Sequence, residues 1–272
     1  MQIFDSKTQS EILEKNISEA VPEGCRAGKL LSIIQVGDEE SSNKFIDLKV
    51  KLCEKYGILC KVEKIDESKK DDEIFKIIEH ILSDENVSGG IIQLPLPRKS
   101  LYKSLDLIPV EKDIDVISTE GKKRFYSGDF SKLSPVVRAF ENFSSYCGLN
   151  FKDLKTVVVG EGDLVGKPIS FYLSRKGADV KTVLDYKSGD KIDCDVLVLS
   201  TGTPNLVKGE DVSEGCNVVD FGSSVVEGKC VGDLDMNSSL NHLGCVSKSP
   251  GGMGPLVVRY LLLNFLDSTN QL

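Results

Sequence analysis

The stretch from Thr156 to Pro168, Thr-Val-Val-Val-Gly-Glu-Gly-Asp-Leu-Val-Gly-Lys-Pro, constrains the fold of this chain more than any other. A β-branched apolar run gives way to three glycines and then to an amphipathic segment. β-Branched residues favour strands, and glycines allow the backbone to turn sharply. The pattern therefore predicts a strand, a tight turn and the start of a helix.

The three glycines of this turn are candidates for binding a phosphate. Gly160 and Gly162 let the backbone approach a ligand with no side chain in between, and a helix starting near Gly166 directs unpaired N–H groups at an anion. The spacing is G-x-G-x-x-x-G, which is one residue longer than the usual dinucleotide fingerprint. The alternative is a glycine turn that serves only the packing of the helix on the strand, so the rest of the chain must decide.

Apolar runs alternate with amphipathic segments along the whole chain. Helices are expected near residues 5–20, 42–56, 72–82, 135–147 and 256–265, and strands near 30–36, 58–65, 89–94, 156–159, 180–184, 194–199 and 218–221. This alternation is typical of a mostly parallel sheet with helices on both faces, which binds ligands at the carboxyl ends of its strands.

We therefore predict an α/β protein of two domains. The first is an α/β/α domain over residues 1–135, and a C-terminal helix over residues 254–272 packs back on it. The second, over residues 136–253, is a Rossmann-like dinucleotide-binding domain. The last helix is so apolar between Leu256 and Phe265 that it must be buried.

The charge balance excludes several classes of protein. With 34 basic and 42 acidic residues the net charge is −8, which argues against nucleic-acid or membrane-surface partners. No apolar run approaches the roughly 20 residues that span a bilayer, and the first residues lack the features of a signal peptide. We expect a cytoplasmic protein.

The cysteines and histidines indicate neither a metal site nor a catalytic triad. The eight cysteines form no C-x-x-C pair and have no histidine nearby, and several lie in apolar patterns typical of reduced core residues. The two histidines, His80 and His242, stand beside no acid or nucleophile in a recognisable motif. No metal is therefore expected.

Polar residues follow the predicted strands where ligands would bind. Gln93 closes one strand before Pro95-Leu-Pro97, and Asp113 and Asp115 lie in a later loop. Asp185 lies 19 residues beyond Gly166, where an acid at the end of the second strand would accept hydrogen bonds from an adenosine ribose. The alternative for Asp185 is a solvated strand-end residue, because aspartates are common in such turns.

Several motifs, in order along nearly the whole chain, resemble one family. Ile92–Pro97 is similar to the motif VQLPLP, Glu111–Asp115 to KDVD and Ser249–Pro255 to VPGGVGP. Further stretches match at Val165–Pro168, Gly202–Pro204, Val218–Gly222 and Gly232–Asp235. The family is that of methylenetetrahydrofolate dehydrogenase/methenyltetrahydrofolate cyclohydrolase. The resemblance implies hydride transfer from methylenetetrahydrofolate to NAD or NADP, and then hydrolysis of the methenyl product to formyltetrahydrofolate.

The resemblance assigns roles to three residues of the first domain. The run Ser42–Lys49 matches the family's S-x-x-Y-x-x-x-K, so Lys49 inherits the place of the catalytic lysine. Gln93 would position its amine, and Asp115 would bind the pterin ring through paired hydrogen bonds. Locally, Lys49 with its neighbouring lysines also fits a solvated basic face. The folate substrate would further contact Phe45, Lys51, Leu94, Pro95, Pro250, Gly251 and Gly252.

The resemblance also assigns the cofactor site and a homodimer. The cofactor-binding residues would be Gly160, Glu161, Gly162, Val165, Gly166, Asp185, Thr201, Gly202, Thr203, Pro204, Asp220 and Gly222. Glu161 stands where the family carries an arginine that, in NADP-using members, holds the ribose phosphate. A glutamate there would repel the phosphate, so we predict a preference for NAD of at least about a hundredfold.

Two other departures bear on activity. Phe45 replaces the family's tyrosine and removes a hydroxyl near Lys49, so the hydrolytic step is the one placed in doubt. Val116 replaces the glycine after KDVD. The alternatives are a dehydrogenase without cyclohydrolase activity, another NAD-dependent dehydrogenase of the same two-domain plan, and a non-catalytic folate- or nucleotide-binding homologue.

Overall fold

The computed structural model describes residues 1–21 and 28–270, and these residues form two compact units. The first unit comprises Leu13–Pro135 with Val258–Leu272, and the second comprises Met1–Ile12 with Val136–Val257. The sequence-based division had placed residues 1–12 in the first domain. They belong to the second unit because the short strand β1 (Gln2–Ile3) pairs with β13 (Cys245–Ser247).

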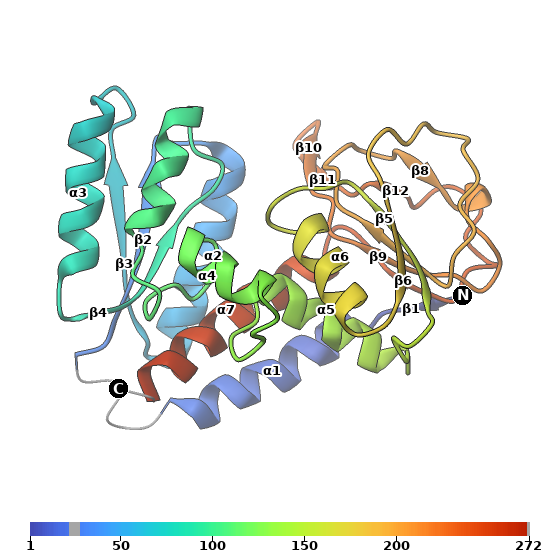
Figure 1. Cartoon of the computed structure of the whole chain (residues 1–272), viewed down its shortest axis with the longest axis horizontal. Helices are drawn as coiled ribbons and strands as arrows, with labels where there is room; N and C mark the ends of the chain where they lie inside the picture. The colour runs from blue at the N-terminus through green and yellow to red at the C-terminus, as the bar shows by residue number, and fades with distance from the viewer. Residues whose placement is uncertain (22–27, 271–272) are drawn as a thin grey trace. The chain divides into compact units, whose positions relative to one another are not determined.

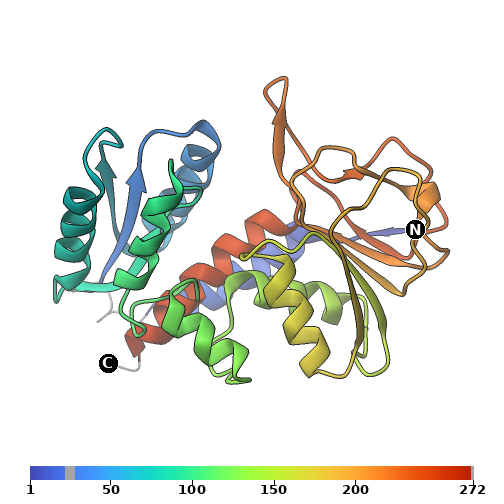
Figure 2. The same ribbon diagram turned by 45° about the horizontal axis from the view of Figure 1, so that its top comes forward.

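The first unit is built on a parallel sheet of three strands in the order β3-β2-β4. Helices lie on both sides of this sheet, with α3 on one face and α2 on the other (Figures 1 and 2). Ile74, Ile78 and Leu82 of α3 pack against Ile34 and Val36 of β2. The elements are β2 (Leu30–Val36), α2 (Glu40–Tyr56), β3 (Leu59–Ile65), α3 (Asp71–Ser83) and β4 (Val87–Ile92).

The first and last helices of the chain, α1 (Ser6–Ala20) and α7 (Met253–Asn270), lie side by side (Figures 1 and 2). In the first unit Arg259 of α7 donates through both Nε and Nη2 to the carboxylate of Glu14 in α1. Burial acts to raise the pKa of Glu14, but hydrogen bonds from Lys55, Tyr56 and Arg259 outweigh it and lower the pKa to about 2. The carboxylate is therefore ionised throughout the neutral range.

The C-terminal half of α7 packs into the first unit, as the sequence predicts. Asn264 donates hydrogen bonds to the backbone oxygens of Ile114 and Leu133, at 2.8 and 2.9 Å. A Cβ on Gly89 of β4 would lie 2.6 Å from the ring of Phe265, so this glycine admits the helix against the sheet. Two further helical segments complete the unit, the 3₁₀ helix η2 (Lys99–Leu107) and α4 (Thr119–Tyr126).

The second unit contains a six-stranded parallel sheet in the order β1-β13-β9-β7-β5-β6. The first strand in this unit's β-α series, β5, lies between β6 and β7, so the strand order reverses there, and ligands of such sheets bind at that point. The elements are α5 (Pro135–Tyr146), β5 (Lys155–Val159), α6 (Gly166–Arg175), β6 (Asp179–Val183), β7 (Val196–Leu199) and β9 (Asn217–Asp220).

Short elements surround this sheet. Figure 2 shows the antiparallel hairpin of β10 and β11 extending from its own unit. Strand β12 pairs with β8 in a separate two-stranded sheet, and η3 follows β8 along the chain. Their bounds are β8 (Val207–Lys208), η3 (Gly209–Asp211), β10 (Ser224–Val226), β11 (Lys229–Val231) and β12 (Leu234–Asp235).

The predicted α/β architecture is confirmed, with its Rossmann-like half and the returning last helix. The sequence offered Ser41 or Ser42 as the cap of α2, but the helix begins earlier, at Glu40. The carboxylate of Glu39 accepts a hydrogen bond from the Ser42 N–H at 2.7 Å and so satisfies one donor of the first turn. Within the described part of the chain, every helix is too short or too polar to cross a bilayer.

Candidate functional site

The centre of the candidate site in the first unit is a hydrogen bond between Lys49 and Gln93. Lys49 Nζ donates to Gln93 Oε1 at 2.6 Å. The orientation of Gln93 is fixed from two sides, because its Nε2 donates to the Leu94 carbonyl at 2.7 Å and its backbone N–H bonds to the Ile34 oxygen of β2. The glutamine therefore presents an acceptor, not a donor, to the lysine.

Lys49 is not part of a solvated basic face, which was the alternative drawn from the sequence. Its side chain is only 7% exposed, whereas Lys44 and Lys51 on the same helix are exposed. Burial lowers the pKa of Lys49, and the nearby carboxylate of Asp115 acts in the opposite direction. A lowered pKa makes a lysine amine a better proton donor in its charged form than an exposed lysine is.

Asp115 is the electrostatic partner of this lysine. Burial raises the pKa of Asp115 to about 6, and the charge of Lys49 limits that rise. An ammonium and a carboxylate that are both desolvated and lie near each other are typical of sites where protons move. The structure thus brings together Lys49, Gln93 and Asp115, the three residues that the resemblance assigned to catalysis.

The other aspartate of this loop, Asp113, serves the fold. Its carboxylate accepts hydrogen bonds from the backbone N–H groups of Ile117 and Ser118 and from the Ser118 hydroxyl, which in turn caps α4 at Gly121. Between these residues Val116 has a φ of +59°. A β-branched residue is strained there by about 1–3 kcal/mol, so a glycine at this position would carry no such cost.

The remaining predicted folate-binding residues of the first unit differ in exposure. Phe45 is half-buried and lies one turn before Lys49 on α2. Leu94 is half-buried and Pro95 is exposed, directly after Gln93. Lys51 is exposed, and two residues along a helix turn its side chain about 200° away from that of Lys49, so the structure does not bring these two lysines together.

The glycine turn of the second unit forms a backbone cradle at the carboxyl end of β5. Gly160 has a φ of +100°, and a Cβ there would lie 2.9 Å from the Ser200 carbonyl oxygen. A Cβ on Gly166 would lie 2.1 Å from the Gly160 oxygen. Val165, at the N-cap of α6, supplies no side-chain cap. These constraints fit a pyrophosphate held by backbone N–H groups.

Gly162 differs from the other two glycines, because a Cβ there would meet nothing within 4 Å. It lies on the open side of the turn, beside the exposed Glu161 and Asp163. Asp163 pairs with Lys167 at 2.7 Å. The glycine turn thus serves packing at Gly160 and Gly166 and leaves free space at Gly162.

Glu161 and Asp185 lie at the same edge of the sheet. Val159 of β5 pairs with Val183 of β6, and the Gly160 N–H bonds to the Val183 oxygen at 3.0 Å. Both strands end here, so the exposed Glu161 and Asp185 follow neighbouring strand ends. The edge is therefore acidic where a dinucleotide ribose would bind.

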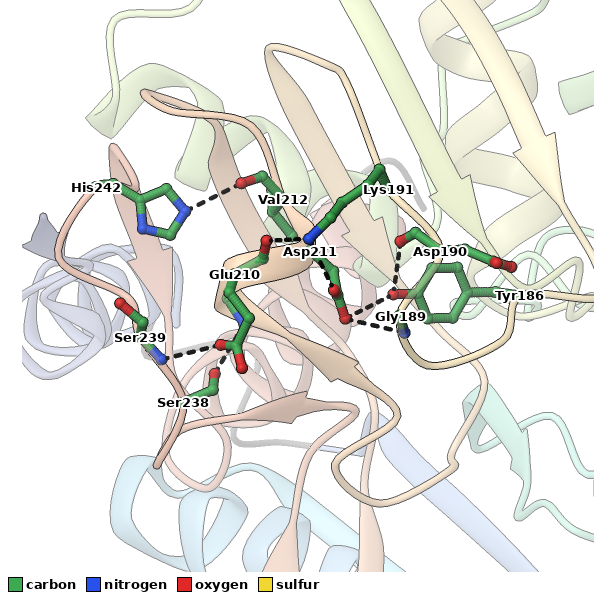
Figure 3. Close-up of polar contacts among 11 residues, drawn as sticks. Tyr186, Gly189, Asp190, Lys191, Glu210, Asp211, Val212, Ser238, Ser239 and His242 are labelled. Carbon is green, nitrogen blue, oxygen red and sulfur yellow. Dashed lines mark hydrogen bonds and ion pairs between the residues drawn. The ribbon is translucent and has the colours of Figure 1, made fainter.

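The loop after Asp185 is held by a residue that the sequence analysis did not single out, Asp211 (Figure 3). Its buried carboxylate accepts hydrogen bonds from the Gly189 N–H at 3.1 Å and the Tyr186 hydroxyl at 3.4 Å, and it pairs with Lys191 at 3.3 Å. Burial, with the nearby charge of Asp211, raises the pKa of Tyr186 to about 12. The loop is thus fixed by contacts with η3.

The segment from Thr201 to Pro204 follows β7, next to β5 in the sheet. Its backbone donates hydrogen bonds to the carboxylate of Asp233, a residue that the sequence indicated only as part of Gly232–Asp235, one of the stretches that match the family. Asp220, a predicted cofactor residue, is buried at the end of β9 and bonds to the Gly222 N–H at 2.7 Å.

The turn over Pro250 to Gly252 precedes α7 in the second unit. A Cβ on Gly252 would lie 2.2 Å from the Lys248 carbonyl oxygen, so the turn requires a glycine there. The Ser249 hydroxyl donates to the Gly222 oxygen at 3.0 Å and links this turn to the loop after β9.

Comparisons with known proteins match the whole of this arrangement. The profile of the catalytic domain of tetrahydrofolate dehydrogenase/cyclohydrolase matches residues 4–115, and that of its NAD(P)-binding domain matches residues 138–272. The chain belongs to this family. The family predicted from the sequence is therefore confirmed, as is the prediction that the chain is an enzyme, a bifunctional tetrahydrofolate dehydrogenase/cyclohydrolase with an NAD(P)-binding domain.

Individual family members agree over nearly their full length. The bifunctional protein FolD of Hydrogenobaculum sp. is 31% identical over 283 residues, which cover 100% of this chain and 99% of that protein. The FolD protein of Mycoplasmopsis synoviae is 34% identical over 248 residues, or 87% of this chain and 88% of that protein. The crystal structure of the bifunctional enzyme FolD from Campylobacter jejuni superposes with a TM-score of 0.88 at 27% identity, covering all of both chains.

Two further observations concern the chemistry. Among residues 1–21 and 28–270, His, Cys, Asp and Glu side chains form no group of three or more that could hold a metal ion. Seven cysteines in this part of the chain are free thiols, and Cys25 lies outside the described residues.

Proposed function

We propose that this enzyme oxidises 5,10-methylenetetrahydrofolate to 5,10-methenyltetrahydrofolate with NAD as the preferred hydride acceptor, and then hydrolyses the product to 10-formyltetrahydrofolate. The observation that supports this proposal most is the buried side chain of Lys49. Its amine donates a hydrogen bond to Gln93 and interacts electrostatically with the carboxylate of Asp115. The dinucleotide, bound at the turn of β5, supplies the hydride acceptor.

Lys49 would act in the hydrolytic step as the group that accepts and returns a proton. Burial lowers the pKa of its amine, which favours the neutral form relative to an exposed lysine, and the hydrogen bond to Gln93 Oε1 fixes the position of the amine nitrogen. A base that is positioned in this way contributes typically 10²–10⁴-fold to a rate. Asp115 would accept paired hydrogen bonds from the amino and amide edge of the pterin ring.

The preference for NAD rests on the acidic edge of the second unit. Glu161 is exposed next to Gly160, at a strand end that neighbours that of Asp185. A 2′-phosphate there would meet two carboxylates, and it would lack the contact with the arginine that Glu161 replaces. Repulsion together with the lost charge-assisted contact supports a preference of at least about a hundredfold for NAD.

The experiment that tests the function uses both dinucleotides and follows both steps. The protein is incubated with methylenetetrahydrofolate and either NAD or NADP, and the absorbance of the methenyl product is recorded as it appears and then decays. We expect faster formation with NAD at low concentration, followed by hydrolysis above the uncatalysed rate. Absence of product with either cofactor would refute the enzyme assignment, and faster formation with NADP would refute the preference.

A second function, a dehydrogenase that no longer hydrolyses its product, is favoured by one observation. Phe45 lies one turn before Lys49 and carries no hydroxyl that could hold the hydrolytic water. In that case the methenyl product would accumulate, and it would then decay only at the uncatalysed rate. A Phe45→Tyr variant would separate the two cases, because only a hydroxyl-dependent step would gain rate.

A further inference from the structure

Two aspartates of the second unit, Asp220 and Asp233, are buried near the carboxyl ends of the strands of its parallel sheet. Asp220 is the last residue of β9 and is 2% exposed, and Asp233 directly precedes β12 and is 0% exposed. Neither takes part in an ion pair with a basic side chain among the described residues. Such burial of two carboxylates is costly unless hydrogen bonds compensate for the lost water.

One carboxylate oxygen of Asp233 accepts hydrogen bonds from a single segment, the loop that begins at Thr201. Its Oδ2 accepts hydrogen bonds from the Thr201 N–H at 2.6 Å, from the Thr201 hydroxyl at 2.9 Å and from the Gly202 N–H at 3.3 Å. The Thr201 hydroxyl in turn accepts the Thr203 N–H at 3.0 Å. Three successive residues therefore take their backbone conformation from one carboxylate oxygen, in the loop that follows β7.

Asp220 and Asp233 are interlocked through two glycines. A Cβ on Gly222 would lie 2.1 Å from Asp233 Oδ1, and a Cβ on Gly232 would lie 2.1 Å from Asp220 Oδ2. Asp220 in turn accepts the N–H groups of Gly222 at 2.7 Å and Leu234 at 3.0 Å. Each glycine thus makes room for the carboxylate of the other loop.

This pair is poorly explained by stability alone. Burial raises the pKa of Asp220 to about 7, with a further contribution from the charge of Asp233, and burial raises the pKa of Asp233 as well. Within the described residues, Asp233 Oδ1 has no hydrogen-bond partner. Buried charged groups are often no more stabilising than apolar residues of similar volume, so what distinguishes Asp233 is the set of hydrogen bonds that it accepts from the loop after β7.

We propose that Asp233 is a positioning residue, which holds Thr201–Thr203 in the conformation that binds the nicotinamide dinucleotide. The inference rests on the proposed function, because it takes this loop as part of the cofactor site. The loop follows β7, which pairs with β5, and β5 ends in the glycine turn, so both segments lie at the same edge of the sheet. Asp233 acts through the loop and need not touch the dinucleotide itself.

The test compares Asp233→Ala with Asp233→Asn in the full-length protein. Four quantities are measured: the dissociation constant for NAD by calorimetry, kcat and KM of the dehydrogenase, and the cyclohydrolase rate with methenyltetrahydrofolate. We expect Asp233→Ala to raise both the KM and the dissociation constant for NAD at least about tenfold, since three hydrogen bonds to one oxygen are lost. Asp233→Asn, which keeps an acceptor oxygen, should restore most of this loss, and the cyclohydrolase rate should stay within about twofold in both variants.

Asp195→Asn is the control. Asp195 Oδ2 accepts the Lys155 N–H at 2.9 Å at the start of β5, the opposite edge of the same sheet, so NAD binding should not change. If Asp233→Ala does not fold, Thr201→Val keeps the backbone contacts with Asp233 but removes the two hydrogen bonds of the Thr201 hydroxyl, to Asp233 and from the Thr203 N–H, and should raise the KM for NAD by several fold.

The outcomes separate this inference from the proposed function. An unchanged KM and dissociation constant for NAD, or a parallel loss of both activities with a lower melting temperature, would overturn the positioning role of Asp233. A wild-type protein that binds NAD but does not oxidise methylenetetrahydrofolate would instead refute the proposed function, and weaker NAD binding by Asp233→Ala would still support the positioning role.

Discussion

The candidate sites of the two units use the same part of the fold in opposite ways. Each lies where parallel strands end, β2 and β4 in the first unit and β5 to β7 in the second. The first unit concentrates buried, ionisable side chains, with Lys49 held by Gln93 beside Asp115. The second presents backbone in a glycine turn, and its exposed side chains are acidic.

This difference follows from what each site must do. Proton transfer requires side chains whose pKa values have been moved toward neutrality, and burial achieves this. Binding a pyrophosphate requires backbone N–H groups and the absence of Cβ atoms. Substitutions in the first unit should therefore affect rates, whereas those in the second should affect the affinity and choice of cofactor.

The largest effect is expected from Lys49→Met, which keeps the apolar stem and removes the amine. The hydrolytic rate should fall about 10³-fold, because the proton-transferring group is lost. Dehydrogenase activity should fall less. Lys44→Met on the same helix is the control, since Lys44 is exposed and pairs with Glu40 at the surface. A hydrolytic rate in Lys49→Met equal to that of the control would contradict the assignment.

The double variant Glu161→Arg, Gly162→Ser should change the choice of cofactor. It restores a positive charge and a hydroxyl in a place where Gly162 has free space, so the fold should tolerate both changes. The ratio of kcat/KM for NAD to that for NADP should fall about a hundredfold. Gly162→Ser alone is the control. A ratio that stays constant in the double variant would show that other residues decide the preference.

A pair of glycine variants tests whether the turn works through its backbone. In Gly166→Ala the new Cβ would lie 2.1 Å from the Gly160 oxygen, so the turn must open, and the KM for the dinucleotide should rise at least about tenfold. In Gly162→Ala the Cβ meets nothing, and the KM should change by less than about twofold. Equal effects in the two variants would argue against the cradle described above.

The smallest effect concerns the pH profile of the first unit. The pKa of Asp115 is raised to about 6, so the carboxylate is protonated below that pH and cannot accept two hydrogen bonds from the substrate. We expect kcat/KM for the folate to fall by up to about tenfold for each pH unit below 6. In Asp115→Asn this acid limb should disappear from a weaker enzyme, and a limb that persists would belong to another group.

Much of the fold could be predicted because the apolar patterns are regular. The runs at 30–36, 156–159 and 218–221 became strands within a residue or so of the predicted bounds, and α7 is buried as its composition required. The short elements were not foreseen, since β1 and β8 have only two residues each and show no period. Pairing with distant strands creates them.

The candidate site was predicted in part. Lys49, Gln93 and Asp115 came from motifs, and the structure brings them together. The roles of Asp211 and Asp233 were missed, because the residues around an aspartate in the sequence do not show which backbone groups its carboxylate will bind. The signal that could have identified Asp233 was a pair of glycines, Gly232 directly before it and Gly222 after β9. Each leaves room for the carboxylate of the other loop.

The sequence by itself determined the order of strands and helices, the glycine turn, the catalytic motif and the acidic residue that displaces an arginine. These are local patterns, set by residue type and spacing. Only the tertiary structure decided which charges are buried, because burial depends on elements far apart in the chain. Lys49 became a buried amine bonded to Gln93 and not a surface lysine, and Asp233 became a buried carboxylate that accepts hydrogen bonds from Thr201 and Gly202, once the sheets and helices had packed around them.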